Sequence, residues 1–333
     1  MKMQLLEKIR EKARKRNRRI ALPEVEDVRI LRAAQEAAAL KVAKIVLVGD
    51  EEKAKAAAKA NSVKLDGIEI INPLKSKNLD KFANEFFQIR KHKGITEAEA
   101  LATAKNPLFY TALMTRFGDV DGFVAGTVET SANVARAGIY CVGVDKSAGT
   151  LSSAFAIVIE GCKYGEEGGF VFSDCAVVPD PSPRQLAGIA YSSGNLFRFL
   201  FEKEPIVALL SYSTKGSASG PMVDKVVEAV RIAKELYPNL KLDGEMQVDA
   251  AVDAGVAKKK CPDSPVGGKA NVLIFPDINS GNIAYKIVDR LAQDSKAIGP
   301  LLQGLAKPCS DLSRGCKWED IVDAIAITAV RDK

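Results

Sequence analysis

A polar segment near the end of the chain carries residue types suited to an anionic substrate. Residues 307–325 read KPCSDLSRGCKWEDIVDAI, which places Ser313, Arg314 and the adjacent carboxylates Glu319 and Asp320 at or before the start of an apolar helical pattern. Arginine pairs with phosphate oxygens through two parallel hydrogen bonds, and a hydroxyl donates to an oxygen that gains charge. We therefore expect this segment to line a site for a phosphate-bearing substrate.

Further hydroxyl-rich and glycine-rich loops follow predicted strands. In residues 125–138, Thr130 and Ser131 are expected to cap a helix that carries Arg136, and to leave N–H groups suited to phosphate. The other candidates for substrate binding are Ser213, Thr214 and Gly216 in loop 211–220 and Asn282 at the end of loop 276–282, while loop 243–251 adds acidic side chains. Each loop taken alone is more simply explained as a helix cap or a turn. Together they predict an anion that the protein binds directly, without a metal.

Short β-branched runs alternate with Ala-rich helical patterns, which is typical of α/β folds with parallel sheets. The first half predicts strands at 19–24, 43–50, 67–72 and 120–126 and a helix at 27–41. The second half predicts a hairpin from strands 154–161 and 168–178, strands at 205–212 and 270–277, and helices at 221–238 and 282–293. We expect two α/β domains with a cleft between them.

The last segment is too short for a domain of its own. It predicts one loop and one helix with a half-buried face, which we expect to return to the first domain and place the loop in the cleft. The domains are therefore expected at 1–147 plus 304–333 and at 148–303, the second with the hairpin.

Composition excludes several classes of function. Hydrophobic residues make up 47% and charged residues 27%, and no apolar run is long enough for a membrane span. The basic run at 8–19 reads as a solvated amphipathic helix, and scattered charge with few aromatics gives no platform for nucleic acid. We find neither a Walker sequence nor a G-x-G-x-x-G after a strand. Six cysteines without a C-x-x-C pair predict reduced thiols in a cytoplasmic protein and no metal site.

Four segments of the sequence resemble a known protein family and make the predicted function more specific. Residues 164–183, 244–251, 263–292 and 311–328 resemble the phosphate acetyltransferase (phosphotransacetylase) family, and the resemblance extends over essentially the whole chain. It implies the reversible reaction of acetyl-CoA with phosphate to give acetyl phosphate and CoA, with CoA as a substrate and no cofactor or metal. It also implies a fold like that of isocitrate and isopropylmalate dehydrogenases, and a homodimer joined through the second domain.

The resemblance also implies roles for individual residues. Ser313 and Arg314 match the family's active-site pair, Asp320 its catalytic base, Arg136 an arginine of the cleft, and Arg90 an arginine implicated in CoA binding. In this mechanism Asp320 takes the thiol proton and the thiolate attacks the carbonyl of acetyl phosphate in a ternary complex. Burial should raise the pKa of Asp320 toward that of a useful base.

Several alternatives stay open. Loops 125–138 and 140–149 depart from the family pattern, so a butyryl or another short-chain acyl preference remains, and Glu319 competes as the base. Cys309 or Cys316 could accept the acyl group, although the single histidine, His92, lies between two lysines and reads as a surface residue. A dehydrogenase of the related fold would need metal-binding aspartates that we do not find. A silent binding module would not need the serine, arginine and aspartate.

Overall fold

The computed structural model describes residues 2–331, which form two compact units. The first, here called the N-terminal unit, contains residues 6–144 and the segment that begins at 305. The second, the central unit, contains residues 145–304 together with residues 2–5, although most of the helix that residues 2–5 begin belongs to the N-terminal unit. The C-terminal segment therefore packs with the first part of the chain.

The N-terminal unit is built on a parallel sheet. Its elements are α1 (Lys2–Arg16), β1 (Arg19–Leu22), α2 (Val28–Ala39), β2 (Lys44–Val48), α3 (Glu51–Ala60), β3 (Glu69–Ile71), η1 (Pro73–Lys75), α4 (Leu79–Arg90), η2 (Lys91–Lys93), α5 (Glu97–Lys105), α6 (Pro107–Phe117), β4 (Gly122–Ala125), α7 (Ser131–Ala137), η3 (Gly138–Val142), β11 (Cys309–Asp311) and α13 (Trp318–Val330). The strand order is β3-β2-β1-β4-β11, and all neighbours are parallel. The four strands and the helix predicted for the first half are confirmed.

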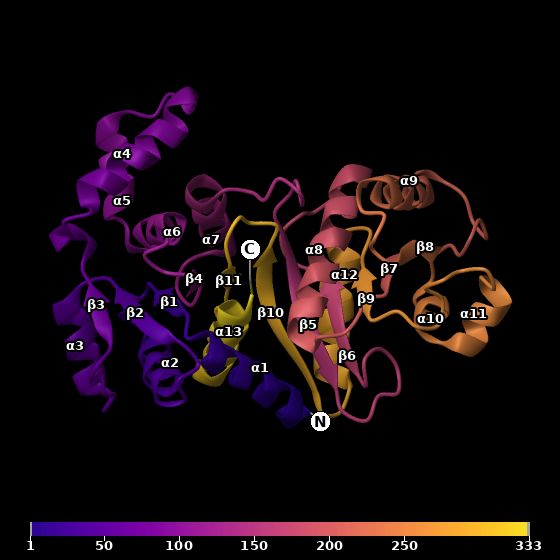
Figure 1. Cartoon of the computed structure of the whole chain (residues 1–333), viewed down its shortest axis with the longest axis horizontal. Coiled ribbons are helices and arrows are strands. Elements are labelled where there is room, and N and C mark those ends of the chain that lie inside the picture. Colours follow the sequence, from indigo (N-terminus) through magenta and orange to yellow (C-terminus); the bar gives the residue numbers. More distant parts are fainter. Residues whose placement is uncertain (1, 332–333) are drawn as a thin grey trace. The chain divides into compact units, whose positions relative to one another are not determined.

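Helices cover both faces of this sheet (Figure 1). Helices α2 and α13 pack against each other and against the strands on one face, while α6 and α7 lie on the other. Asp27 caps α2 by accepting a hydrogen bond from the N–H of Arg29, and Ile30, Leu31 and the alanines of α2 are buried. The prediction of a half-buried α13 was wrong, because residues 321–330 are all buried. A helix enclosed in this way is apolar around most of its circumference.

The loop expected at 307–315 contains a strand instead. Residues Cys309–Asp311 form β11, whose Ser310 lies beside Val124 of β4. The segment lacks the β-branched residues that mark strands, so pairing with a long-range partner decides its structure. The C-terminal segment consequently places a strand, a turn and a helix against the N-terminal unit.

The central unit has a mixed sheet. Its elements are β5 (Ser152–Ile159), β6 (Gly169–Ser173), α8 (Pro183–Phe201), β7 (Val207–Leu210), α9 (Pro221–Leu236), β8 (Leu242–Met246), α10 (Val248–Val252), α11 (Ala254–Lys260), β9 (Val272–Ile274), α12 (Ile278–Leu291) and β10 (Ser295–Gln303). The strand order is β10-β5-β6-β9-β7-β8. The antiparallel β5–β6 hairpin is confirmed, and β10 adds a further antiparallel strand that was not predicted.

Loop 243–251 was also predicted incorrectly. Its first part belongs to β8, which pairs in parallel with β7, and its second part forms α10. The aspartate, glycine and glutamate of this segment are typical of loops, but all residues of β8 are buried. On one face of the sheet, Phe155, Phe170, Phe172 and Phe275 form an apolar core, with the Tyr285 ring of α12 stacked on Phe155 at 3.9 Å. Helices α8 and α9 pack on the other face (Figure 1).

No helix within residues 2–331 combines the length and the apolar character needed to cross a bilayer.

Candidate active site

Three loops meet at one edge of the sheet in the N-terminal unit. Strand β4 lies between β1 and β11, and all three run in the same direction. The segments that follow their carboxyl ends are therefore neighbours, as is typical of ligand sites in open α/β sheets. A close approach confirms this, because a Cβ added at Gly126 would lie against the carboxyl of Asp311 and 2.7 Å from the nitrogen of Leu312.

The loop after β11 presents the predicted Ser313 and Arg314. Both are exposed, and the turn is closed by the Ser313 carbonyl, which accepts the N–H of Cys316 at 2.9 Å. Asp320 lies in the first turn of α13, half-buried, and its carboxylate accepts the N–H of Lys317 at 3.0 Å. Glu319, the competing carboxylate, is exposed. The structure thus places the predicted serine, arginine and base on one turn and the helix that follows it.

The loop after β4 leads into α7 and carries three further predicted residues. The Thr130 hydroxyl caps the helix by accepting the N–H of Asn133 at 3.2 Å, and an Nη atom of Arg136 donates to the Asn133 side chain at 2.7 Å. Ser131 lies near the carboxyl of Asp311 at the end of β11, where it acts to lower the pKa of that group. The start of α7 is therefore next to the strand that leads directly to Ser313.

Four N–H groups of this loop, before the helix that Thr130 caps, already have a partner. The carboxylate of Glu24 accepts the backbone N–H groups of residues 126, 127, 128 and 129 at 2.7–3.0 Å, and the Thr127 hydroxyl at 2.9 Å. Sequence analysis placed Glu24 inside a strand, whereas β1 ends at Leu22. The only sequence signal was a carboxylate directly after a buried apolar run.

Arg29 connects the same loop to the turn that carries Arg314. Its guanidinium donates to the carbonyls of Arg314 at 2.7 Å, Cys316 at 3.1 Å and Thr127 at 3.0 Å. Asp27 orients it, with an Nη–carboxylate distance of 2.6 Å. Burial alone would raise the pKa of Asp27, but hydrogen bonds and charge from Arg29 lower it below its usual range. Sequence analysis missed both residues, because Asp27 reads as a simple cap and Arg29 as a surface residue.

A buried carboxyl group lies beneath these loops. Asp311 is 2% exposed, and its Oδ1 has no hydrogen-bond partner. Burial, with a contribution from the charge of Glu24, raises the pKa of Asp311 to about 6, although Ser131 and the backbone of Leu312 act to lower it. Shifted carboxyl groups of this kind are common at functional sites. The sequence analysis passed over Asp311 as one of several polar loop residues.

Arg90, the predicted CoA ligand, ends helix α4. Its guanidinium stacks on the Tyr140 ring, 3.7 Å from the ring centroid. Tyr140 belongs to η3, which follows α7 directly. Arg90 therefore contacts the segment next to the helix that carries Arg136.

The predicted residues of the central unit are engaged in hydrogen bonds of their own. Ser213 and Thr214 are buried, and their hydroxyls donate to side-chain oxygens of Glu245 and Gln247 at 3.0 and 3.3 Å. The N–H of Gly216 donates to the same Glu245 carboxylate at 2.8 Å. The side chain of Asn282 donates to the Cys175 carbonyl at 2.9 Å. The contribution of these four residues to substrate binding stays a prediction.

The thiols near the Ser313–Arg314 turn are weak nucleophiles. Burial raises the pKa of Cys309 to about 12 and that of Cys316 to about 11. The fraction of thiolate at neutral pH is therefore very small, and neither thiol is well suited to accept an acyl group. His92 is exposed in η2.

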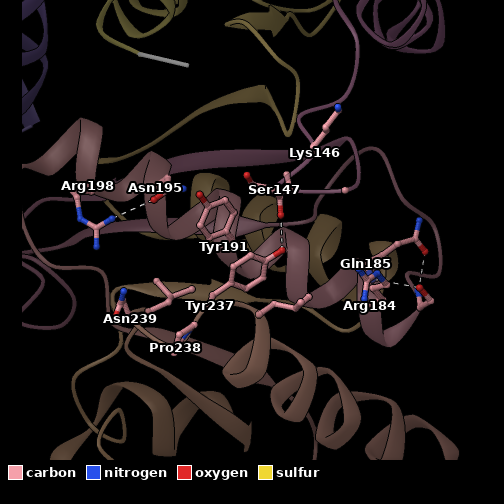
Figure 2. A pocket seen from close by; sticks show the side chains of 15 residues that line it. Lys146, Ser147, Arg184, Gln185, Tyr191, Asn195, Arg198, Tyr237, Pro238 and Asn239 are labelled. Carbon is pink, nitrogen blue, oxygen red and sulfur yellow. Dashed lines mark hydrogen bonds between the residues drawn. The ribbon is translucent and has the colours of Figure 1, made fainter.

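Figure 2 shows a cavity of about 600 Å³ in the central unit, beside α8 and the residues that follow α9. The rings of Tyr191 and Tyr237 stack in it at 4.3 Å, and the Tyr237 hydroxyl donates to the Ser147 carbonyl. None of the predicted site residues lines this cavity. Within the described part of the chain, no group of three His, Cys, Asp or Glu residues is arranged to hold a metal ion.

Comparisons with known proteins agree with the resemblance seen in the sequence. The family profile described as phosphate acetyl/butaryl transferase matches residues 4–329. The phosphate acetyltransferase of Thermoanaerobacterium thermosaccharolyticum is 45% identical over 329 residues, which is 99% of each chain. The phosphate acetyltransferase of Treponema pallidum is also 45% identical, over 333 residues and 99% of each chain.

Solved structures give the same result for the fold. A phosphotransacetylase from Streptococcus pyogenes superposes with a TM-score of 0.92 at 36% identity, covering 98% of each chain. A 4-hydroxythreonine-4-phosphate dehydrogenase from Klebsiella pneumoniae reaches a TM-score of 0.55 at 12% identity, covering 94% of this chain and 100% of that one, and shares the fold alone. The predicted α/β class is thus confirmed, and the chain belongs to the phosphate acetyl/butaryl transferase family.

Proposed function

We propose that this protein is a phosphate acetyltransferase, which transfers the acetyl group reversibly between CoA and phosphate. The observation that carries the proposal is the 45% identity to proteins named phosphate acetyltransferase over 99% of both chains. The geometry agrees with it, because an exposed arginine and serine lie on a turn at the edge of a parallel sheet, and Arg29 donates hydrogen bonds to two carbonyls of this turn.

Asp320 is the proposed base. It takes the proton from the CoA thiol, and the thiolate attacks the carbonyl carbon of acetyl phosphate. A C–S bond forms, the bond between the carbonyl carbon and the phosphate oxygen breaks, and phosphate leaves with the electron pair. At neutral pH only a few per cent of a free thiol with a pKa of about 8.5 is thiolate, so a base at this step speeds the reaction.

Arg314 and Ser313 are proposed to stabilise the charge that develops. The Arg314 guanidinium is exposed and suited to two phosphate oxygens, while its own carbonyl is held by Arg29. The Ser313 hydroxyl would donate to the carbonyl or phosphate oxygen as charge builds there. Arg136, Arg90, Thr130 and Ser131 are proposed to bind the substrates, as are Ser213, Thr214, Gly216 and Asn282.

An acyl-cysteine route is a specific alternative with a simple kinetic test. Direct transfer in a ternary complex predicts intersecting double-reciprocal lines when CoA and acetyl phosphate are both varied, whereas an acyl-enzyme predicts parallel lines. The raised pKa values of Cys309 and Cys316 favour direct transfer.

We also propose a homodimer formed through the central unit. Ile283, Ile287 and Leu291 of α12 are 57%, 51% and 78% exposed and repeat at every fourth position, which makes an apolar stripe on one side of the helix. A second copy of this stripe is the expected partner. Light scattering should show a dimer for the wild type and for Lys286→Glu, and a monomer for Ile287→Glu. A monomeric wild type would contradict the proposal.

The proposed activity is tested by thioester formation from CoA and purified protein, with acetyl, propionyl and butyryl phosphate as donors. We expect the highest kcat/KM with acetyl phosphate. A preference for butyryl phosphate would favour the butyryl-transferring alternative. Absence of a thioester product with every donor would overturn the proposal.

We also propose a cytoplasmic location, because the described cysteines are free thiols.

A further inference from the structure

Glu24 occupies an anion site made by the protein itself. Four consecutive N–H groups, from residues 126 to 129, point at its two carboxylate oxygens, and the Thr127 hydroxyl adds a fifth hydrogen bond. Successive backbone N–H groups that converge in this way form a nest, which binds phosphate or carboxylate. In this protein the bound anion is a side chain from the loop after β1, about a hundred residues away in the sequence.

The backbone at Glu24 is also strained. Its φ is 67°, in the left-handed region that is unfavourable for a residue with a side chain. The chain keeps a glutamate here although glycine would adopt this conformation freely. The five hydrogen bonds to the carboxylate offset the strain. We therefore attribute the glutamate at this position to its carboxylate and not to the backbone conformation of the turn.

The loop that Glu24 holds is connected to the turn with Ser313 and Arg314 by two contacts. Gly126, inside the nest, lies against the carboxyl of Asp311 and the backbone of Leu312, and the Thr127 carbonyl accepts from Arg29, which also donates to the carbonyl of Arg314. A change in the nest is therefore transmitted to the turn through both contacts.

We propose that Glu24 is a positioning residue for the acyl transfer, whose carboxylate acts as a built-in anion that fixes the nest and, through it, the Ser313–Arg314 turn. This inference rests on the proposed function for its catalytic consequence. One further consequence is that these four N–H groups are unavailable to the substrate. We therefore expect side chains such as Arg314 to be the main ligands of the phosphoryl group.

Two substitutions distinguish the role of the Glu24 carboxylate from that of the Glu24 backbone conformation. Glu24→Gly removes the anion and relieves the strain, so the fold should remain stable while the nest is empty. Glu24→Gln keeps the shape but turns an amide NH₂ toward N–H donors, which fills the nest without satisfying it. Glu26→Gln is the matched control, because Glu26 lies two residues away in the same loop and pairs with Lys53 instead.

Hydrogen exchange followed by mass spectrometry on the full chain is the first readout, since it does not depend on activity. In Glu24→Gly we expect residues 126–129 and 313–316 to exchange at least about tenfold faster, and Glu26→Gln to behave as the wild type. Added formate, which can enter the empty nest, should slow the exchange of Glu24→Gly and leave Glu24→Gln unchanged. Unchanged exchange in Glu24→Gly, or no response to formate, would overturn the proposed anion role.

The second readout is the rate of acetyl-CoA formation. We expect kcat to fall by at least about tenfold in both Glu24 variants and to recover partly with formate in Glu24→Gly alone. If exchange accelerates while kcat stays within about threefold of the wild type, the nest does not position the reaction and the inference fails. A wild type without acetyl transfer would instead overturn the proposed function, and the exchange data would still decide the role of the nest.

Discussion

Replacement of Arg29 by lysine tests whether the Ser313–Arg314 turn must be fixed for turnover. The guanidinium makes three hydrogen bonds to carbonyls on two loops, at 2.7, 3.1 and 3.0 Å. A lysine ammonium is a single point on a flexible stem and cannot reach both loops while it pairs with Asp27. We therefore expect it to lose two of the three bonds.

The expected effect follows from the usual contribution of such bonds. A hydrogen bond from a charged donor contributes about 1.5–3 kcal/mol, and we take the lower value because the Arg29 side chain is 28% exposed. Loss of two bonds then costs about 3 kcal/mol, which would lower kcat/KM about a hundredfold if all of this free energy serves to order the turn. Part of the free energy will instead appear as lower protein stability, so we expect kcat/KM to fall by ten- to about a hundredfold.

The assay is the initial rate of acetyl-CoA formation with acetyl phosphate varied, together with thermal unfolding of the same samples. Arg32→Lys is the control, since Arg32 lies on the exposed side of the same helix. A value of kcat/KM for Arg29→Lys within about twofold of the wild type would refute the reasoning.

Two further predictions concern the buried edge beneath the turn. Because the folded pKa of Asp311 is about 6 and the unfolded value is near 3.8, ionisation opposes folding as pH rises through this window. In urea unfolding, the free energy of unfolding of Asp311→Asn should rise by roughly 3 kcal/mol relative to that of the wild type between about pH 4 and pH 7. A difference between the two proteins that does not change with pH would contradict the raised pKa of Asp311. Gly126→Ala should lower the free energy of unfolding by about 3 kcal/mol in the same measurement, because the φ of Gly126 is 116° and the new Cβ would meet Asp311 and the Leu312 backbone. A loss below about 1 kcal/mol would show that the loops can separate.

Much of the fold follows from local sequence patterns. Strands β1, β2, β7 and β9 are runs of Val, Ile, Leu and Ala between loop residues, and each was predicted near its observed position. Strands β8 and β11 were missed because LDGEM and CSD have the composition of loops. Their pairing with β7 and β4 is a long-range event that no local pattern reveals.

The same limit applies to the candidate site. The polar segment that contains Ser313, Arg314 and Asp320 is recognisable locally, and the family resemblance implied the roles of these residues. Glu24 and Arg29 were not identified, because their roles depend on partners about 100 and 285 residues away. The sequence could suggest that loop 125–138 binds an anion, but it could not show that the anion is a carboxylate of the protein itself.

The central claim is that Asp320 takes the thiol proton while Ser313 and Arg314 hold the acyl phosphate. It is tested most directly by comparing Asp320→Asn with the wild type in acetyl-CoA formation at saturating substrates, together with calorimetric measurement of CoA binding. We expect kcat to fall by about 10²–10⁴-fold while the Kd for CoA changes by less than about threefold. A variant that retains the wild-type kcat would contradict the account.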